Sequence, residues 1–158
     1  NQFDAKLIIN DSVEIAKSTG ADGVHLGKDD MNLLKARETL GDSMLIGVTI
    51  HSEDEISDNT YEFADYAGIG PFRNSKTKSE LNPQLSENDY STIIHLLDPM
   101  PVFLIGGINS QDFTTIQRLG NHGLAVCSAL SKDLSLDNSN IKEFMSESEK
   151  HDKILALN

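Results

Sequence analysis

Six short apolar runs recur along the chain, and each is followed by a polar or glycine-rich cluster and then by a segment with helical features. Such runs predict buried strands, at 5–9, 23–27, 44–48, 65–69, 102–105 and 123–127. Helices are predicted at 13–19, about 31–40, 53–59, 86–97, about 110–119, and within 140–153. This alternation is typical of a parallel sheet covered by helices.

Six β-α units in succession indicate most of a TIM (β/α)8 barrel, with residues 1–158 forming a single barrel domain. Six units do not close an eight-stranded barrel, so we expect the domain to be incomplete, with two further units before Asn1. An open doubly wound sheet is the alternative architecture. The sequence lacks the Gly-x-Gly-x-x-Gly turn of dinucleotide-binding sheets, which weakens that alternative.

The charge of the chain limits its partners. It carries 25 acidic and 13 basic residues, a net charge of −12, which argues against binding to nucleic acid or to an anionic membrane surface. No apolar run approaches the roughly 20 residues of a membrane span. A local basic pocket for a phosphorylated small molecule remains compatible with this charge. The lone Cys127 lies in an apolar run and is predicted to be a reduced core residue of a cytoplasmic protein.

Two acidic residues follow neighbouring predicted strands. Asp11 ends the first and Asp30 lies just past the second. Adjacent parallel strands lie about 5 Å apart, so the two carboxylates could share one Mg²⁺ ion. The alternative is that each aspartate is a helix N-cap, with Ser12 competing with Asp11 for that role.

Other strand ends carry groups suited to an oxyanion. The loop at 70–78 supplies the hydroxyls of Ser75 and Thr77 and the charge of Lys78. Gly106-Gly107 precedes a helix, where backbone N–H groups can approach a phosphate. A solvated loop and a tight turn are the alternatives. His25 is predicted to be a hydrogen-bonded structural residue within a strand.

Taken together, these features resemble the thiamine-phosphate synthase family over about residues 5–132. The matching runs occur in the family's order and spacing, at 8–11, 20–27, 29–31, 46–49, 68–78, 105–108 and 128–129. The resemblance implies a TIM-barrel transferase of thiamine biosynthesis. Such an enzyme joins hydroxymethylpyrimidine diphosphate to thiazole phosphate with Mg²⁺, and forms thiamine phosphate and pyrophosphate.

The resemblance also implies a role for each matched residue. Asp11 and Asp30 are the implied Mg²⁺ ligands, Asn10 and Lys78 contact the pyrimidine diphosphate, and Thr49 touches the pyrimidine. Lys78 and Thr49 are the implied catalytic residues. The implied thiazole-phosphate site consists of Ser75, Thr77, Gly107, Cys127 and Ser128.

The sequence departs from the family pattern in three ways. Lys28 stands where the family usually has glutamine, and Ser75 replaces the first threonine of a Thr-x-Thr-Lys motif. The first two β-α units, which carry a glutamine-and-lysine motif that grips the diphosphate, are not in these 158 residues. Without them we expect neither a closed barrel nor turnover. The alternative functions are those of a thiazole tautomerase-like barrel and of a non-catalytic thiamine-precursor binding protein. The sequence is compatible with a homo-oligomer.

Overall fold

Strands and helices alternate along the chain in the computed structural model, which describes residues 5–56, 60–73, 84–132 and 135–151. The strands of the main sheet are β1 (Ile8–Asn10), β2 (Gly23–Leu26), β3 (Leu45–Ile50), β4 (Tyr66–Ile69), β5 (Val102–Ile105) and β6 (Gly123–Ala125). The α-helices are α1 (Val13–Thr19), α2 (Leu33–Leu40), α3 (Glu87–Leu97), α4 (Phe113–Arg118) and α5 (Asn138–His151).

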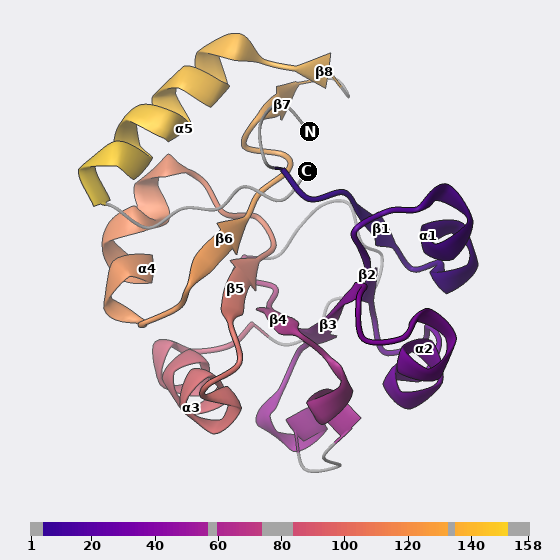
Figure 1. Ribbon diagram of the computed structural model, residues 1–158. Coiled ribbons are helices and arrows are strands. Elements are labelled where there is room, and N and C mark those ends of the chain that lie inside the picture. The colour runs from indigo at the N-terminus through magenta and orange to yellow at the C-terminus, as the bar shows by residue number, and fades with distance from the viewer. Residues whose placement is uncertain (1–4, 57–59, 74–83, 133–134, 152–158) are drawn as a thin grey trace.

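The six strands form one parallel sheet in which each strand pairs with the next along the chain, in the order β1-β2-β3-β4-β5-β6. Figure 1 shows the sheet curled into an arc, with α1 to α4 on its outer side. A doubly wound sheet reverses its strand order at a switch point, and this sheet has no reversal. The chain is therefore an α/β fold with a half-barrel of six parallel strands.

The core lies between the outer face of the arc and the helices. Side chains alternate across a strand, so every second residue faces the helices. The fully buried outward residues include Val24 of β2, Ile46 of β3 and Leu104 of β5. They belong to two clusters, one around α1 and α2 and the other around α3 and α4. The inner face of the arc is thereby left to other residues.

Local signals set the helix ends. Helix α1 has the predicted bounds, because the Ser12 side chain accepts a hydrogen bond from Ile15 N at its start. Gly20 adopts φ 65° and ends the helix. Helix α2 begins at Leu33, later than predicted, because its N-cap is Asn32.

Two predicted helices take another form in the structure. Where the structure describes it, the helix predicted at 53–59 is a short 3₁₀ helix, Glu53–Ile56, and a second 3₁₀ helix, Thr60–Phe63, follows beyond the predicted bounds. Acidic residues fill the first of these segments and leave it no apolar face long enough for an α-helix. The helix predicted at 110–119 is divided into a 3₁₀ turn, Ser110–Asp112, and α4.

A small hairpin between β6 and α5 has no counterpart in the sequence analysis. Strands β7 (Ser131–Lys132) and β8 (Ser135–Leu136) pair antiparallel. Over the described ranges, no helix has the length and apolar character needed to cross a bilayer.

Arg37 ties together the loops at the amino end of the sheet. Its guanidinium donates to the backbone oxygens of Phe63 (3.0 Å), Gly41 (3.0 Å) and Met44 (2.9 Å) and to the carboxylate of Asp65 (2.7 Å). The side chain is only 16% exposed. The planar fork of an arginine can serve several acceptors at once, whereas a lysine ammonium is a point charge.

We therefore expect Arg37→Lys to lower the free energy of unfolding by about 1–2 kcal/mol, since partly buried carbonyl acceptors would lose their donors. Urea unfolding followed by circular dichroism measures this loss. The matched control is Arg118→Lys, because Arg118 is 64% exposed and pairs with exposed Glu87. A control loss equal to that of Arg37→Lys would contradict the proposed cause.

Candidate active site

A polar row crosses the inner face of the arc through β2, β3 and β4. His25, Gly47 and Tyr66 are partners in register, and the His25 and Tyr66 rings lie 5.5 Å apart. The Tyr66 hydroxyl is 3.1 Å from His25 Nδ1. A Cβ atom at Gly47 would lie 2.1 Å from Tyr66 Cζ and 2.5 Å from His25 Nδ1. The two side chains can meet because the residue between them is glycine.

His25 also contacts the hydroxyl of Thr49, which lies two residues after Gly47 on the same face of β3. The Nε2 atom of His25 lies 2.8 Å from Thr49 Oγ1. If protonated Tyr66 donates to Nδ1, His25 donates to Thr49 through Nε2, and the O–H of Thr49 stays available to a ligand. The prediction that His25 is hydrogen-bonded is confirmed.

This network borders a pocket of about 190 Å³ on the inner face of the sheet. Its lining combines apolar side chains with a few polar groups, as ligand pockets do; the lining residues are Ile8, Asn10, His25, Tyr66, Gly68, Phe103, Ile105 and Ala125. The pocket therefore places Asn10 and His25 on the same cavity.

Asp11 lies at the end of β1 beside the end of β2. Its backbone N–H donates to His25 O at 2.9 Å, and its Oδ1 accepts from Asn10 Nδ2 at 2.6 Å. Its φ angle is 68°, the left-handed region that non-glycine residues rarely occupy. The cap of α1 is Ser12, so the alternative that Asp11 is an N-cap is wrong.

Asp30 lies in the turn after β2. Its Oδ2 accepts from Gly27 N at 2.6 Å, and its Oδ1 takes no part in that bond. The cap of α2 is Asn32, so Asp30 is not an N-cap either. Within the described ranges, no group of three or more His, Cys, Asp or Glu side chains could hold a metal. A metal here would rest on two carboxylates and on oxygen atoms from water or a ligand.

The loops after β4 and β5 run side by side with little between their backbones. A Cβ atom at Gly70 would lie 2.2 Å from Ile105 O, and one at Gly106 would lie 2.9 Å from Pro71 Cα. Gly107, with φ 64°, would place a Cβ atom 2.9 Å from the Cβ of Arg73. Glycine is thus required at these positions for close approach.

The predicted oxyanion loop falls partly outside the described residues. Ser75, Thr77 and Lys78 all lie there, so the structure does not place them. The described flank ends at Arg73, beside Gly107. Arg73 forms a two-pronged ion pair with Asp112, and these hydrogen bonds raise the pKa of Arg73 above its ordinary value.

Cys127 and Ser128 follow β6, and both are exposed. The prediction that Cys127 is a core residue is wrong. Side chains alternate between the two faces of a strand, and Leu124 and Val126 are buried against the helices. Cys127 belongs to the opposite face and lies beyond the end of β6. Its position at the carboxyl end of β6 is the position expected of a ligand-facing residue.

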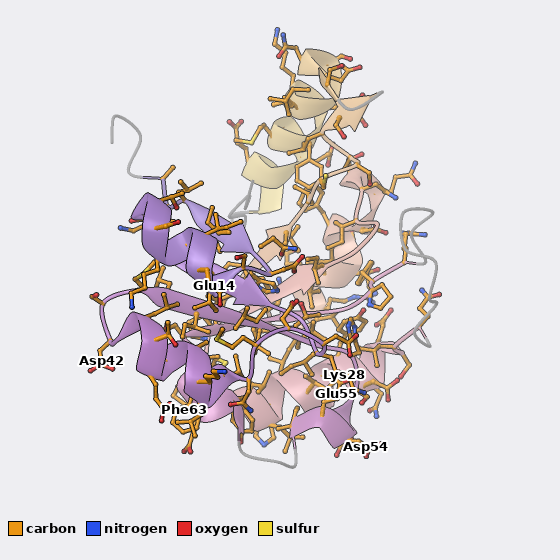
Figure 2. All side chains as sticks on the ribbon, turned by 90° about the vertical axis from the view of Figure 1, so that its right-hand side faces the viewer. Glu14, Lys28, Asp42, Asp54, Glu55 and Phe63 are labelled. Carbon is orange, nitrogen blue, oxygen red and sulfur yellow. The ribbon has the colours of Figure 1, made fainter. Side chains whose placement is uncertain are left out.

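The loops at the carboxyl ends of the strands therefore share one end of the molecule. Figure 2 shows Lys28 and Glu55 together at that end, where they form an ion pair of 3.8 Å, and Asp42 and Phe63 at the other.

The family model for thiamine monophosphate synthase matches residues 1–130. The chain belongs to the thiamine monophosphate synthase family. It is 38% identical to a thiamine-phosphate synthase of Flavobacterium psychrophilum over 135 residues, which cover 83% of this chain and 66% of that protein. It is 40% identical to the thiamine-phosphate synthase of Bacteroides fragilis over 131 residues, which cover 80% of this chain and 64% of that protein. The chain thus spans somewhat less than two thirds of these relatives.

Solved structures agree with the family assignment. Thiamine phosphate pyrophosphorylase of Pyrococcus furiosus superposes with a TM-score of 0.78 at 27% identity, over 94% of this chain and 70% of that one. N-(5'-phosphoribosyl)anthranilate isomerase of Pyrococcus furiosus shares the fold alone, with a TM-score of 0.63 at 13% identity over 90% of this chain and 73% of that one.

Three residues of this thiamine monophosphate synthase family chain were missed as site residues. Tyr66 stood in an apolar run, and its contact with His25 spans 41 positions. Arg73 and Asp112 are 39 positions apart. Asp112 did carry a local signal, because it lies three residues after Asn109 and completes a capping box with it. Its pairing with Arg73 had no signal in the sequence.

Tyr66 provides a pH-dependent test of the polar row. Burial, aided by the charge of Asp65, raises the pKa of Tyr66 to about 12 from 10.0. The neutral phenol is favoured in the folded state, so its contribution to stability is complete below pH 10 and is lost as pH rises toward 12. We expect the stability difference between wild type and Tyr66→Phe to shrink across this window in urea unfolding.

The same variant should lose a tyrosinate absorbance step near pH 12, and Tyr61→Phe is the control that keeps it. Burial also raises the pKa of Tyr90, so the amplitude of the step is compared: an unchanged amplitude near pH 12 in Tyr66→Phe would show that Tyr66 does not ionise there.

Proposed function

We propose that the protein carrying this chain is a thiamine-phosphate synthase. It would couple hydroxymethylpyrimidine diphosphate to thiazole phosphate and release pyrophosphate. Family membership supports the reaction class. Ser12 and Asn32 cap α1 and α2, so Asp11 and Asp30 are not needed as caps. This observation is the main support for a metal site at Asp11 and Asp30.

Asp11 and Asp30 suit Mg²⁺ because both supply hard oxygen donors, one at the end of β1 and the other in the turn after the neighbouring β2. The strained backbone of Asp11 supports a functional role, since such strain concentrates at functional sites. Bound Mg²⁺ would neutralise the charge that develops on the departing diphosphate.

The reaction breaks the bond between the pyrimidine methylene carbon and the diphosphate oxygen, and pyrophosphate leaves with the electron pair. The thiazole nitrogen then donates its lone pair to that carbon. The aminopyrimidine ring stabilises positive charge on the methylene, so the protein needs no nucleophile of its own. Its task is to hold two substrates in line and to stabilise the leaving group.

Residues of this chain divide that task between them. Thr49, hydrogen-bonded to His25, would orient the pyrimidine, and Asn10 would reach it from the pocket that His25 also lines. Lys78 would hold the diphosphate. The thiazole phosphate would be bound by groups from three loops, namely Ser75, Thr77, Gly107, Cys127 and Ser128.

The decisive experiment measures thiamine phosphate formation from the two precursors, with Mg²⁺ and with chelator, in the whole protein that carries this chain, as wild type and as Asp30→Asn. An asparagine oxygen can still accept from Gly27 N, so the turn persists while the charge is lost. We expect Mg²⁺-dependent product from wild type and a loss of about 100-fold or more in Asp30→Asn.

Asp42→Asn is the control, because it removes an exposed carboxylate at the opposite end of the molecule (Figure 2) and should leave activity unchanged. Full activity in Asp30→Asn would refute the metal assignment. Absence of product in wild type would favour a tautomerase or a binding protein.

A further inference from the structure

The Tyr66 hydroxyl is a buried hydrogen-bond donor that needs an acceptor. Tyr66 is only 8% exposed. Burial, aided by the charge of Asp65, raises its pKa to about 12, so the phenol keeps its proton at neutral pH. Among the residues that the structure describes, the one hydrogen-bond partner of this hydroxyl is His25 Nδ1, at 3.1 Å. If Nδ1 were the donor, the buried O–H would be left unpaired, so Nδ1 is the acceptor.

The role of Nδ1 determines the role of the other ring nitrogen of His25. A neutral imidazole carries one N–H, so an accepting Nδ1 leaves the hydrogen on Nε2. Nε2 lies 2.8 Å from Thr49 Oγ1 and therefore donates to that oxygen. The O–H of Thr49 is then left to donate elsewhere, and no acceptor in the described part of the chain takes it. With the hydrogen on Nδ1 instead, Nε2 would accept from Thr49 and use up that O–H.

Thr49 lies beside the pocket on the inner face of the sheet. It is half-buried, it shares a face of β3 with Gly47, and it is bonded to His25, which lines the pocket. The polar side chains of the pocket lining are Asn10, His25 and Tyr66. His25 and Tyr66 use their donors on each other and on Thr49. The hydrogen of Thr49 is consequently the donor that this polar row offers to a ligand.

We infer that Tyr66 and His25 are positioning residues that hold the Thr49 hydroxyl as a hydrogen-bond donor, and that the site selects a heteroaromatic ring which presents an acceptor atom to it. This inference rests on the proposed function for the identity of the ring only. In an aminopyrimidine the two ring nitrogens are acceptors, whereas the amino group donates through its hydrogens. The contact of Thr49 is therefore with a ring nitrogen and not with the amino group.

Nitrogen NMR of the imidazole rings tests the tautomer without any ligand, in the whole protein that carries this chain at neutral pH. The signals of His25, assigned by their loss in His25→Gln, should show hydrogen on Nε2 and none on Nδ1. Tyr66→Phe removes the donor to Nδ1, so a mixture of the two tautomers should appear. The matched control is Tyr90→Phe, which removes a buried hydroxyl that has no hydrogen-bond partner and should leave the tautomer unchanged.

Two NMR results would overturn the inference: hydrogen on Nδ1 in wild type, alone or together with Nε2, and an unchanged tautomer in Tyr66→Phe. Calorimetric titration with hydroxymethylpyrimidine diphosphate, without thiazole phosphate, then tests the donor. Thr49→Val keeps the shape but removes the hydroxyl, and should weaken binding about tenfold, whereas Thr49→Ser should bind within about twofold of wild type. Equal binding by Thr49→Val and wild type would contradict a hydrogen bond from Thr49.

A double variant distinguishes positioning from direct contact. Tyr66→Phe should weaken binding about fivefold in wild type and not at all in Thr49→Val, because Tyr66 acts through Thr49. Additive losses would show that Tyr66 touches the ligand itself, and would overturn its positioning role.

Two analogues, each with C–H in place of one ring nitrogen, identify the accepting atom. One of them should bind wild type about tenfold more weakly than the parent, and should bind Thr49→Val as well as the parent does. Equal affinity of wild type for the parent and both analogues would overturn the assignment of an acceptor. Absence of any binding by wild type would refute only the proposed function, because the tautomer is measured without a ligand.

Discussion

The arrangement of the site depends on the parallel pairing of six strands in the order of the sequence. Because all strands run the same way, their carboxyl ends and the loops that follow them meet at one end of the molecule. Because side chains alternate, outward residues such as Val24 and Ile46 form the core with the helices. The inner face is then free to carry His25, Thr49 and Tyr66, whose hydrogen bonds span three strands. Stability and binding chemistry are thereby assigned to opposite faces of the same sheet.

Glycine makes both polar assemblies possible. Gly47 separates His25 from Tyr66 in the ladder, and any side chain there would occupy the space in which the two rings meet. At the carboxyl end, Gly106 and Gly107 let the backbone of one loop lie against the next. These three glycines are thus needed for close approach, whereas Gly20 is needed for its left-handed conformation at the end of α1. Gly47, Gly106 and Gly107 allow groups from neighbouring β-α units to approach within hydrogen-bond range.

The sequence predicted the units of the fold because their signals are local. Apolar runs located the strands, and Ser12 and Gly20 bounded α1 to the residue. The prediction was wrong where the length of a segment, or the face of the strand on which a residue lies, decided the structure. The acidic segment after β3 was too short and too polar for an α-helix. Cys127 is apolar in character but lies on the inner parity beyond its strand. Pairs such as Arg73 and Asp112 depend on tertiary contact, and no spacing along the chain indicates them.

The distinction between a cap and a ligand was also undecided in the sequence, because an aspartate after a strand suits either role. In the structure, a nearby residue caps each helix in place of the aspartate. Ser12 directly follows Asp11, and Asn32 lies two residues after Asp30, and each takes the capping bond that its acidic neighbour could have accepted. Asp11 moreover keeps an unfavourable backbone conformation. Folding requires neither carboxylate as a helix cap, although Asp30 Oδ2 also stabilises the turn after β2 by accepting from Gly27 N. The proposed Mg²⁺ site would give both carboxylates a role at the carboxyl ends of the strands.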